Sequence, residues 1–153
     1  MKRVTALLLA LSTLPAFAAE PAHQHPGKSV EYRKPIPLNA EEAAHVRLEM
    51  RLFLTSVQKI VTAAAYNDMK VVAEAAGESG MAAAHNVPAG LREKLPLEFK
   101  KLGHATHEGF DDLARDAASM ADGNLALKQL GKLMQNCVSC HATFRIGSQT
   151  GKP

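Results

Sequence analysis

The residues best suited to chemistry in this 153-residue chain lie near its C-terminus, in the segment Cys137-Val138-Ser139-Cys140-His141. On a helix, two thiols three residues apart stand on nearly the same side, and the adjacent imidazole follows them. Both thiols can then add across the two vinyl groups of one haem while His141 binds the iron. The segment therefore predicts one covalent haem c, attached through Cys137 and Cys140, with His141 as the proximal iron ligand.

Three other uses of a Cys-x-x-Cys pair fit this chain less well. A thiol-redox pair usually opens a helix after a strand, whereas these cysteines lie near the end of a helical pattern. A zinc site needs a second ligand pair, for which only His104 and His107 can be proposed. A disulfide is disfavoured because cysteines three residues apart in a continuous helix close poorly.

The first of four expected helices begins at a capping box, Asn39 with Glu42, and runs to about Ala65. Apolar residues recur along it at steps of three and four, which is the seam of a helix packed in an antiparallel bundle. These residues are Val46, Met50, Phe53, Val57, Ile60 and Ala64.

Three more helices are predicted from the same periodicity. The second starts at Asn67 or Asp68, the third near Pro96 after a connection with one helical turn at 89–94, and the fourth after the turn 122–124. Their predicted inner faces are Met69, Val72, Ala73 and Ala76; Phe99, Leu102, Thr106, Phe110, Leu113 and Ala117; and Leu127, Leu130, Met134, Cys137, His141 and Phe144.

The predicted fold class is all-α. Strand-forming residues are sparse and never alternate cleanly with polar ones, so no sheet is expected. Four helices with mostly short links favour an antiparallel up-down-up-down bundle. Gly103 and Gly109 fall inside the third helix, where each costs about 1 kcal/mol, and are tolerable if something bulky lies close to the backbone.

The first eighteen residues have the features of a cleaved export signal. Lys2 and Arg3 precede an apolar run, 4–14, that is too short to span a bilayer, and Ala16-Phe17-Ala18 is a small-x-small cleavage site. The expected organisation is a signal peptide at 1–18, an extended proline-bearing leader at 19–38 and a helical domain at 39–153. Cleavage after Ala18 predicts a periplasmic protein without stable membrane insertion.

Charge and composition exclude two classes of function. Without Lys2 and Arg3, the 18 basic residues fall to 16 against 15 acidic ones, a net charge of +1, and no basic run exists to bind nucleic acid. No catalytic triad or carboxylate pair is convincing, so no enzymatic activity is predicted.

His23 and His25 in the leader are expected to be solvated, with a metal-binding role as the alternative.

The position of the haem motif, on the last helix and close to the chain end, resembles the class II c-type cytochromes, the family of cytochrome c′ and cytochrome c-556. The resemblance covers about 39–146 and is specific at Cys137, Cys140, His141 and the pair Phe144-Arg145. It implies a haem inside the bundle with Arg145 beside it. A cation favourable to the helix C-terminus is the alternative reading of Arg145.

The resemblance also implies the residue on the other face of the iron. In this family the distal residue lies on the first helix and is followed by core positions three, seven and ten residues later. Met50, with Phe53, Val57 and Ile60, reproduces that spacing, so Met50 is the predicted distal ligand. Rival methionines are Met69, Met81, Met120 and Met134, and the alternative role of Met50 is to fill the core.

One departure concerns an arginine that family members often carry four residues before the distal position. This chain has Val46 there and Arg47 next to it; aligning Arg47 instead would place Arg51 at the distal position and break the apolar seam. Arg47 or Arg51 is still expected to be able to reach a propionate.

Methionine ligation implies a periplasmic carrier of single electrons that docks on redox partner proteins. The alternative is a five-coordinate protein of the cytochrome c′ kind that binds NO or CO. A weak docking rim is expected at Lys128, Lys132, Arg145 and Lys152. A homodimer and a monomer are both left open. His45, His104 and His107 are expected to be solvated or hydrogen-bonded; the alternatives are a surface metal pair or a propionate contact for His104 and His107, and distal ligation of the iron for His107.

Overall fold

The structure is a computed structural model that describes residues 31–148. The chain falls into two units, Met1–Glu31 and Tyr32–Pro153, and all the described secondary structure belongs to the second. The predictions for the signal peptide, His23, His25 and Lys152 lie outside the described residues. Most of the described residues are helical, and the elements in chain order are β1 (Lys34–Leu38), α1 (Ala40–Ala65), α2 (Met69–Gly77), α3 (Met81–Ala84), α4 (Ala89–Lys94), α5 (Leu97–Met120), α6 (Gly123–Thr143) and β2 (Phe144–Ser148).

Polar side chains begin the helices as predicted. The Asn39 side chain accepts a hydrogen bond from the Glu42 amide at 2.9 Å, and the Glu42 carboxylate accepts one from the Asn39 amide at 2.9 Å. Asp68 accepts from the Val71 amide at the start of α2, and Asp122 accepts from two amides at the start of α6. These caps satisfy amides that a helix start leaves without partners, and they confirm the predicted beginnings of α1, α2 and α6.

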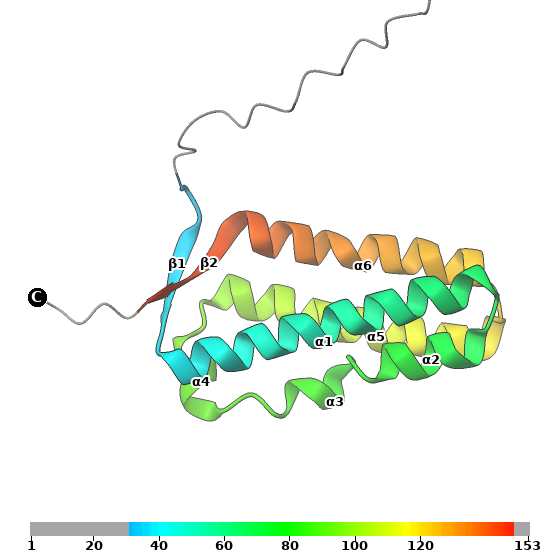
Figure 1. Ribbon diagram of the computed structural model, residues 1–153, viewed down its shortest axis with the longest axis horizontal. Coiled ribbons are helices and arrows are strands. Elements are labelled where there is room, and N and C mark those ends of the chain that lie inside the picture. Colours follow the sequence, from blue (N-terminus) through cyan, green and yellow to red (C-terminus); the bar gives the residue numbers. More distant parts are fainter. Residues whose placement is uncertain (1–30, 149–153) are drawn as a thin grey trace, which may run out of the picture. The chain divides into compact units, whose positions relative to one another are not determined.

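The four longer helices share one hydrophobic core. α5 packs against α2 and α6, and α1 packs against the same two helices (Figure 1). Phe53 of α1 stacks on Phe110 of α5 with ring centroids 5.6 Å apart. The most deeply buried side chains around this contact are Ile60, Val72, Phe110 and Leu113.

Two glycines allow close approach between helices. A Cβ at Gly109 would lie 2.5 Å from a methyl group of Leu133 on α6, and one at Gly123 would lie 2.6 Å from the carbonyl oxygen of Ala64. Gly109 therefore has the bulky neighbour that the sequence led us to expect. Gly103 does not, because nothing lies within 4 Å of a Cβ placed there.

The expectation that the chain has no sheet is wrong. β1 and β2 pair in parallel, with Ile36 opposite Ile146 and Pro35 opposite Arg145. Both members of a two-stranded sheet are edge strands, where proline is tolerated, so Pro35 and Pro37 do not prevent pairing. Ile36 and Leu38 alternate with exposed residues and are buried, which is the period of a half-buried strand.

The sheet lies at the α4 end of the helices and is covered by a second, smaller core (Figure 1). Phe99 of α5 meets Phe144 of β2 edge to face with centroids 5.8 Å apart. Cys140 packs against this cluster, whose buried members are Ile36, Leu38, Ala43, Val46, Leu91 and Phe144. The small core thus supports the end of the molecule that carries the Cys-x-x-Cys-His segment.

Three further details differ from the sequence prediction. Leu127 was placed on the inner face of the last helix but is 39% exposed, because Ala126, Leu130 and Leu133 form the buried face instead. Phe144 begins a strand rather than continuing the helix, and the connection before α5 contains α3 as well as the predicted turn.

Candidate functional site

The Cys-x-x-Cys-His segment lies in the last turns of α6. Cys137 and Cys140 are half-buried free thiols, whereas His141 is exposed. Burial raises the pKa of both thiols above the ordinary value, and the pKa of Cys140 is raised further by Cys137 beside it. A reactive redox cysteine needs the opposite, a lowered pKa at a helix start. The position and the pKa directions therefore argue against a thiol-redox pair.

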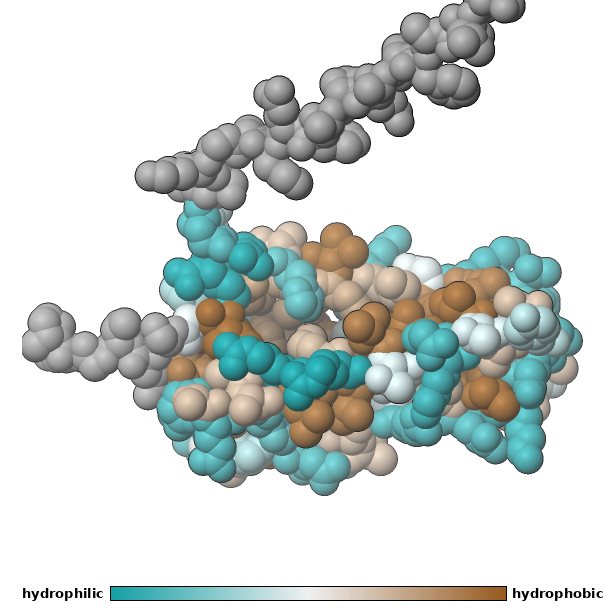
Figure 2. All heavy atoms as spheres, viewed as in Figure 1, coloured by the Kyte–Doolittle hydropathy of each residue, from teal (hydrophilic) through white to brown (hydrophobic). Residues whose placement is uncertain are grey.

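A cavity of about 410 Å³ opens in front of these residues, between α1, α5 and α6. We call it the α1–α6 cavity. In Figure 2 hydrophobic residues lie on both sides of the hollow between α1 and α6. The walls of this cavity are mainly apolar. The residues that line it include Met50, Phe53 and Val57 of α1, Phe99, Leu102 and Thr106 of α5, and Met134, Cys137, Cys140 and His141 of α6.

A second cavity of about 410 Å³ adjoins the first toward the sheet. The two share Met50, Arg51, Cys140 and His141 in their walls. The second is rich in guanidinium groups, and we call it the arginine cavity after Arg33, Arg47, Arg51 and Arg145. Together they form an apolar space with a cationic end, which is the chemistry that receives a flat apolar molecule carrying carboxylates.

Arg145 is the most informative of these arginines. It follows Phe144 in β2, and its Nε is buried with no hydrogen-bond partner among the described residues. A buried charged donor without a partner costs free energy, so such an atom points to an acceptor that the protein alone does not provide.

Met50 reaches both cavities and is half-buried. Of the methionines in the described part of the chain, Met50 and Met134 line the cavity that also contains His141. Met134 lies on α6, the helix that carries His141 itself. Met69 is buried in the main core, and Met120 is 58% exposed at the end of α5.

His107 lines the α1–α6 cavity, but both of its ring nitrogens have partners within the protein. Its Nδ1 lies 2.8 Å from the carbonyl oxygen of Ser79 and its Nε2 lies 3.4 Å from a Glu49 carboxylate oxygen. Burial lowers the pKa of His107, but the bonds to Glu49 and to Ser79 outweigh it, and the net pKa is raised above 6.5. His107 is a hydrogen-bonded structural histidine, which was the default expectation.

Two other histidines are at the surface or only half covered. The Nε2 of His104 lies 3.2 Å from the Glu108 carboxylate, one turn away on the exposed side of α5. His45 is half-buried on α1. Within residues 31–148 no three His, Cys, Asp or Glu side chains are grouped so that they could hold a metal ion, which leaves the His104 and His107 zinc reading without support.

Sequence reasoning missed Glu49, Arg33 and Ile36. Glu49 precedes Met50 on α1 and lies in the cavity wall, but a single carboxylate on a helix gives no signal of a partner on another helix. The alternation of Ile36 and Leu38 between prolines was the signal for β1, which brings Arg33 to the arginine cavity.

Comparisons with protein-family models, with curated proteins and with solved structures give no match. In the part of the chain that is described, none of the helices combines the length and the apolar character needed to cross a membrane.

Proposed function

We propose that this protein is a periplasmic c-type cytochrome that carries single electrons through one covalently bound haem with His141 and Met50 as axial ligands. The proposal includes the class II family relationship and the up-down-up-down arrangement of α1, α2, α5 and α6. A haem c supplies an iron that accepts and releases one electron at a time. Everything else in the proposal concerns what the residues of this chain do.

The donor set and the space around it fit a haem. The α1–α6 cavity, at about 410 Å³, falls within the roughly 300–1,000 Å³ of ordinary ligand pockets even before the adjoining cavity is added. Its apolar walls suit a porphyrin ring. Cys137 and Cys140 would form the thioether links, and His141 follows them on the same helix.

The arginine cavity fits the polar edge of the same group. Arg145 would donate its unpartnered Nε to a propionate, as a charge-assisted hydrogen bond inside the protein. Arg47 and Arg51 are exposed members of the same wall and would add positive charge there. The departure from the family pattern at Val46 therefore does not leave the propionates without cations.

The observation that carries the proposal is that Met50 of α1 shares its cavity with Cys140 and His141 of α6. A thioether is a soft ligand suited to haem iron, and ligation by Met and His raises the reduction potential. Because both ligands would be retained in either oxidation state, little rearrangement accompanies electron transfer. This favours a carrier over the five-coordinate protein that binds NO or CO.

Intact mass and absorption spectra of the purified protein test the proposal. We expect the mass of one haem added to the chain, and a low-spin ferric spectrum with the band given by methionine bound to iron. Met50→Ala should abolish that band, whereas Met134→Ala, in the same cavity but on the helix of His141, should keep it.

Two results would contradict the proposal in different ways. If the chain has no added mass and its cysteines are free or disulfide-bonded, the proposed haem attachment is wrong. If the spectrum is high-spin and changes readily with CO, haem is attached but the protein is the gas-binding alternative and not an electron carrier.

The proposed export also has a direct test. The N-terminal sequence determined for the exported protein should begin at Ala19.

A further inference from the structure

We propose that this protein has a second ligand site, on the side of α5 that faces α3 and α4, and that it takes a small amphiphilic carboxylate. The site is a cavity of about 310 Å³ that shares Phe99 with the arginine cavity and shares Glu49, Phe99, Gly103 and His107 with the α1–α6 cavity. We call it the α3–α5 cavity. The proposal does not depend on haem. Most of this cavity is enclosed by α3, α4, the connection between them and the first half of α5, and none of these segments contains a residue that would attach haem.

The cavity exists because the chain between α2 and α5 is held away from α5 by two short helices. Gly80 fixes the beginning of α3, where the Met81 amide donates to the Asp111 carboxylate of α5 at 3.0 Å. α4 lies farther along, at the sheet end (Figure 1). Between these two fixed points, Gly103 leaves α5 without a side chain, and the space stays open.

The walls of the α3–α5 cavity are mostly apolar. Met81 and Ala84 of α3, Val87 and Leu95 of the connections and Phe99 of α5 supply this surface. A short apolar body bound there would remove part of this surface from water, which favours binding.

Among residues 31–148, no carboxylate forms an ion pair with Arg92 or Lys100, the two cations of the cavity. Arg92 donates to the Ala84 carbonyl at 3.4 Å, which holds its guanidinium at the cavity. Lys100 lies across from it on α5 and lines the same cavity. A carboxylate placed between them would make charge-assisted hydrogen bonds to both.

The acidic groups near the cavity do not cancel these two charges. Glu49 is also in the wall, but it lies 3.4 Å from His107, whose raised pKa favours the cationic form of that pair. Glu108 lies beside His104 at 3.2 Å. Glu93 shares an adjoining hollow with Arg92 and Lys100 and is the one nearby carboxylate that competes for them.

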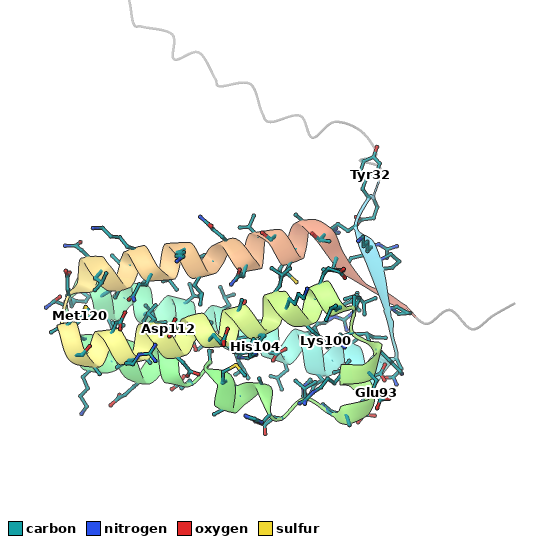
Figure 3. All side chains as sticks on the ribbon, turned by 180° about the vertical axis from the view of Figure 1, so that it is seen from behind. Tyr32, Glu93, Lys100, His104, Asp112 and Met120 are labelled. Atoms are coloured by element: carbon teal, nitrogen blue, oxygen red, sulfur yellow. The ribbon has the colours of Figure 1, made fainter. Side chains whose placement is uncertain are left out.

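Figure 3 shows Lys100 and His104 one turn apart on α5, with Glu93 beyond them on α4. Arg92 and Lys100 supply positive charge beside the apolar wall of the α3–α5 cavity, and Glu93 is a competing carboxylate in the adjoining hollow. A monocarboxylate with a short alkyl or aromatic body matches both the apolar wall and the two cations. An alcohol matches only the apolar wall, and an alkylammonium ion is repelled by the two cations.

Isothermal titration of the full protein with hexanoate, hexanol and hexylamine tests the site. We expect one hexanoate per chain, at least tenfold weaker binding of hexanol and no binding of hexylamine. Lys100→Gln and Arg92→Gln should each weaken hexanoate about tenfold, and Glu93→Gln should strengthen it about threefold.

Neighbouring residues that do not line the cavity supply matched controls. Lys101→Gln, beside Lys100 on α5, should bind hexanoate like the natural protein. Ala84→Trp should fill the cavity and abolish binding, while Ala82→Trp on the same short helix should not. Lys100 is exposed, so Lys100→Gln decides the question even if Arg92→Gln does not fold.

Three results would overturn the site. The first is that hexanoate gives no heat of binding up to about 10 mM, which would mean a binding free energy weaker than roughly 3 kcal/mol. The second is equal affinity for hexanoate and hexanol. The third is that Lys100→Gln and Lys101→Gln weaken hexanoate binding equally. Because the titration is independent of the absorption spectrum, failure of this site and failure of the haem proposal are distinguishable.

Discussion

His107 and Glu49 form a buried polar pair between α5 and α1, and it has a defined dependence on pH. The folded-state pKa of His107 is raised, because its bonds to Glu49 and the Ser79 carbonyl outweigh the effect of burial. The stability gained from the raised pKa is therefore fully present below the ordinary pKa of 6.5 and is lost as pH rises through the folded-state value.

We expect the free energy of unfolding of the natural protein to fall, relative to that of His107→Gln, as pH rises above the ordinary histidine pKa of 6.5. Glutamine keeps hydrogen-bonding capacity but does not titrate. Urea unfolding at several pH values, followed by circular dichroism, measures both curves. Parallel curves would show that the pKa of His107 is the same in the folded and the unfolded protein.

At the same pair, His107→Ala should cost about 2–3 kcal/mol near pH 6, because it leaves the Ser79 carbonyl and the Glu49 carboxylate without their partner. His104→Ala, on the exposed side of the same helix, is the control and should change stability by less than about 0.5 kcal/mol. Equal losses for the two variants would contradict the structural role assigned to His107.

Ser56 and Ser79 form a second buried polar contact, with their hydroxyl oxygens 2.8 Å apart and both side chains almost fully buried. Removing one hydroxyl leaves the other unpaired, so Ser56→Ala should destabilise the protein by about 1–3 kcal/mol. The double variant Ser56→Ala with Ser79→Ala should recover much of that loss. Strictly additive losses in a double-mutant cycle would mean that the two hydroxyls do not interact.

Among the elements, the glycines of α5 and α6 differ in a way that only their surroundings explain. In protein prepared without haem, Gly103→Ala should stabilise the fold by about 0.5–1 kcal/mol, since alanine is the better helix former and no described protein atom lies within 4 Å of a Cβ there. Gly123→Ala should destabilise it, since its Cβ would lie 2.6 Å from a backbone oxygen of Ala64.

Thermal unfolding of the two glycine variants tests this contrast. Gly109→Ala is the intermediate case, because its Cβ would meet a leucine methyl group that can turn away rather than backbone. A stabilised Gly123→Ala variant would contradict the close approach of α6 to the end of α1.

The beginnings of the helices could be predicted from sequence because they depend on neighbours along the chain. Asn39 and Glu42 are three residues apart, and Asp122 accepts from amides two and three residues later. The inner face of α6 was placed partly wrong at Leu127 because two overlapping stripes, one through Leu127 and one through Ala126, share Leu130. Only the packing of the other helices decides between them.

The candidate site was predictable to the same extent. Cys137, Cys140 and His141 are local in sequence, and Met50 was placed by the resemblance to class II c-type cytochromes. The contact of His107 with Glu49, the approach of Arg33 and the cavity beside α3 all depend on elements far apart in the chain. No local pattern encodes them, so they emerge only from the three-dimensional structure.

For the molecule as a whole, the pairing of β1 with β2 is the contact that joins the two ends of the described chain. Ile36 is 2% exposed within the small core that also packs against Cys140. Ile36→Ala should destabilise the protein by about 2–4 kcal/mol, through lost burial and the space left behind. Lys34→Ala, exposed in the same strand, is the control and should have little effect.

Loss of that strand should also be felt at the site. If Ile36→Ala loosens the small core, alkylating reagents should modify Cys140 faster than in the Lys34→Ala variant, in protein prepared without haem. Mass spectrometry of timed samples measures both rates. Equal rates would show that β1 does not protect the end of α6.

The parallel pairing also sets an order of events during biosynthesis. β1 is among the first of the described residues to leave the ribosome and β2 is the last, so the two strands meet only after every helix between them has been made. Contacts between residues so far apart in sequence form late, because closing a long loop of chain costs entropy. Cys140, which packs against the small core that contains β1, therefore stays accessible on the newly made chain until the two strands have paired.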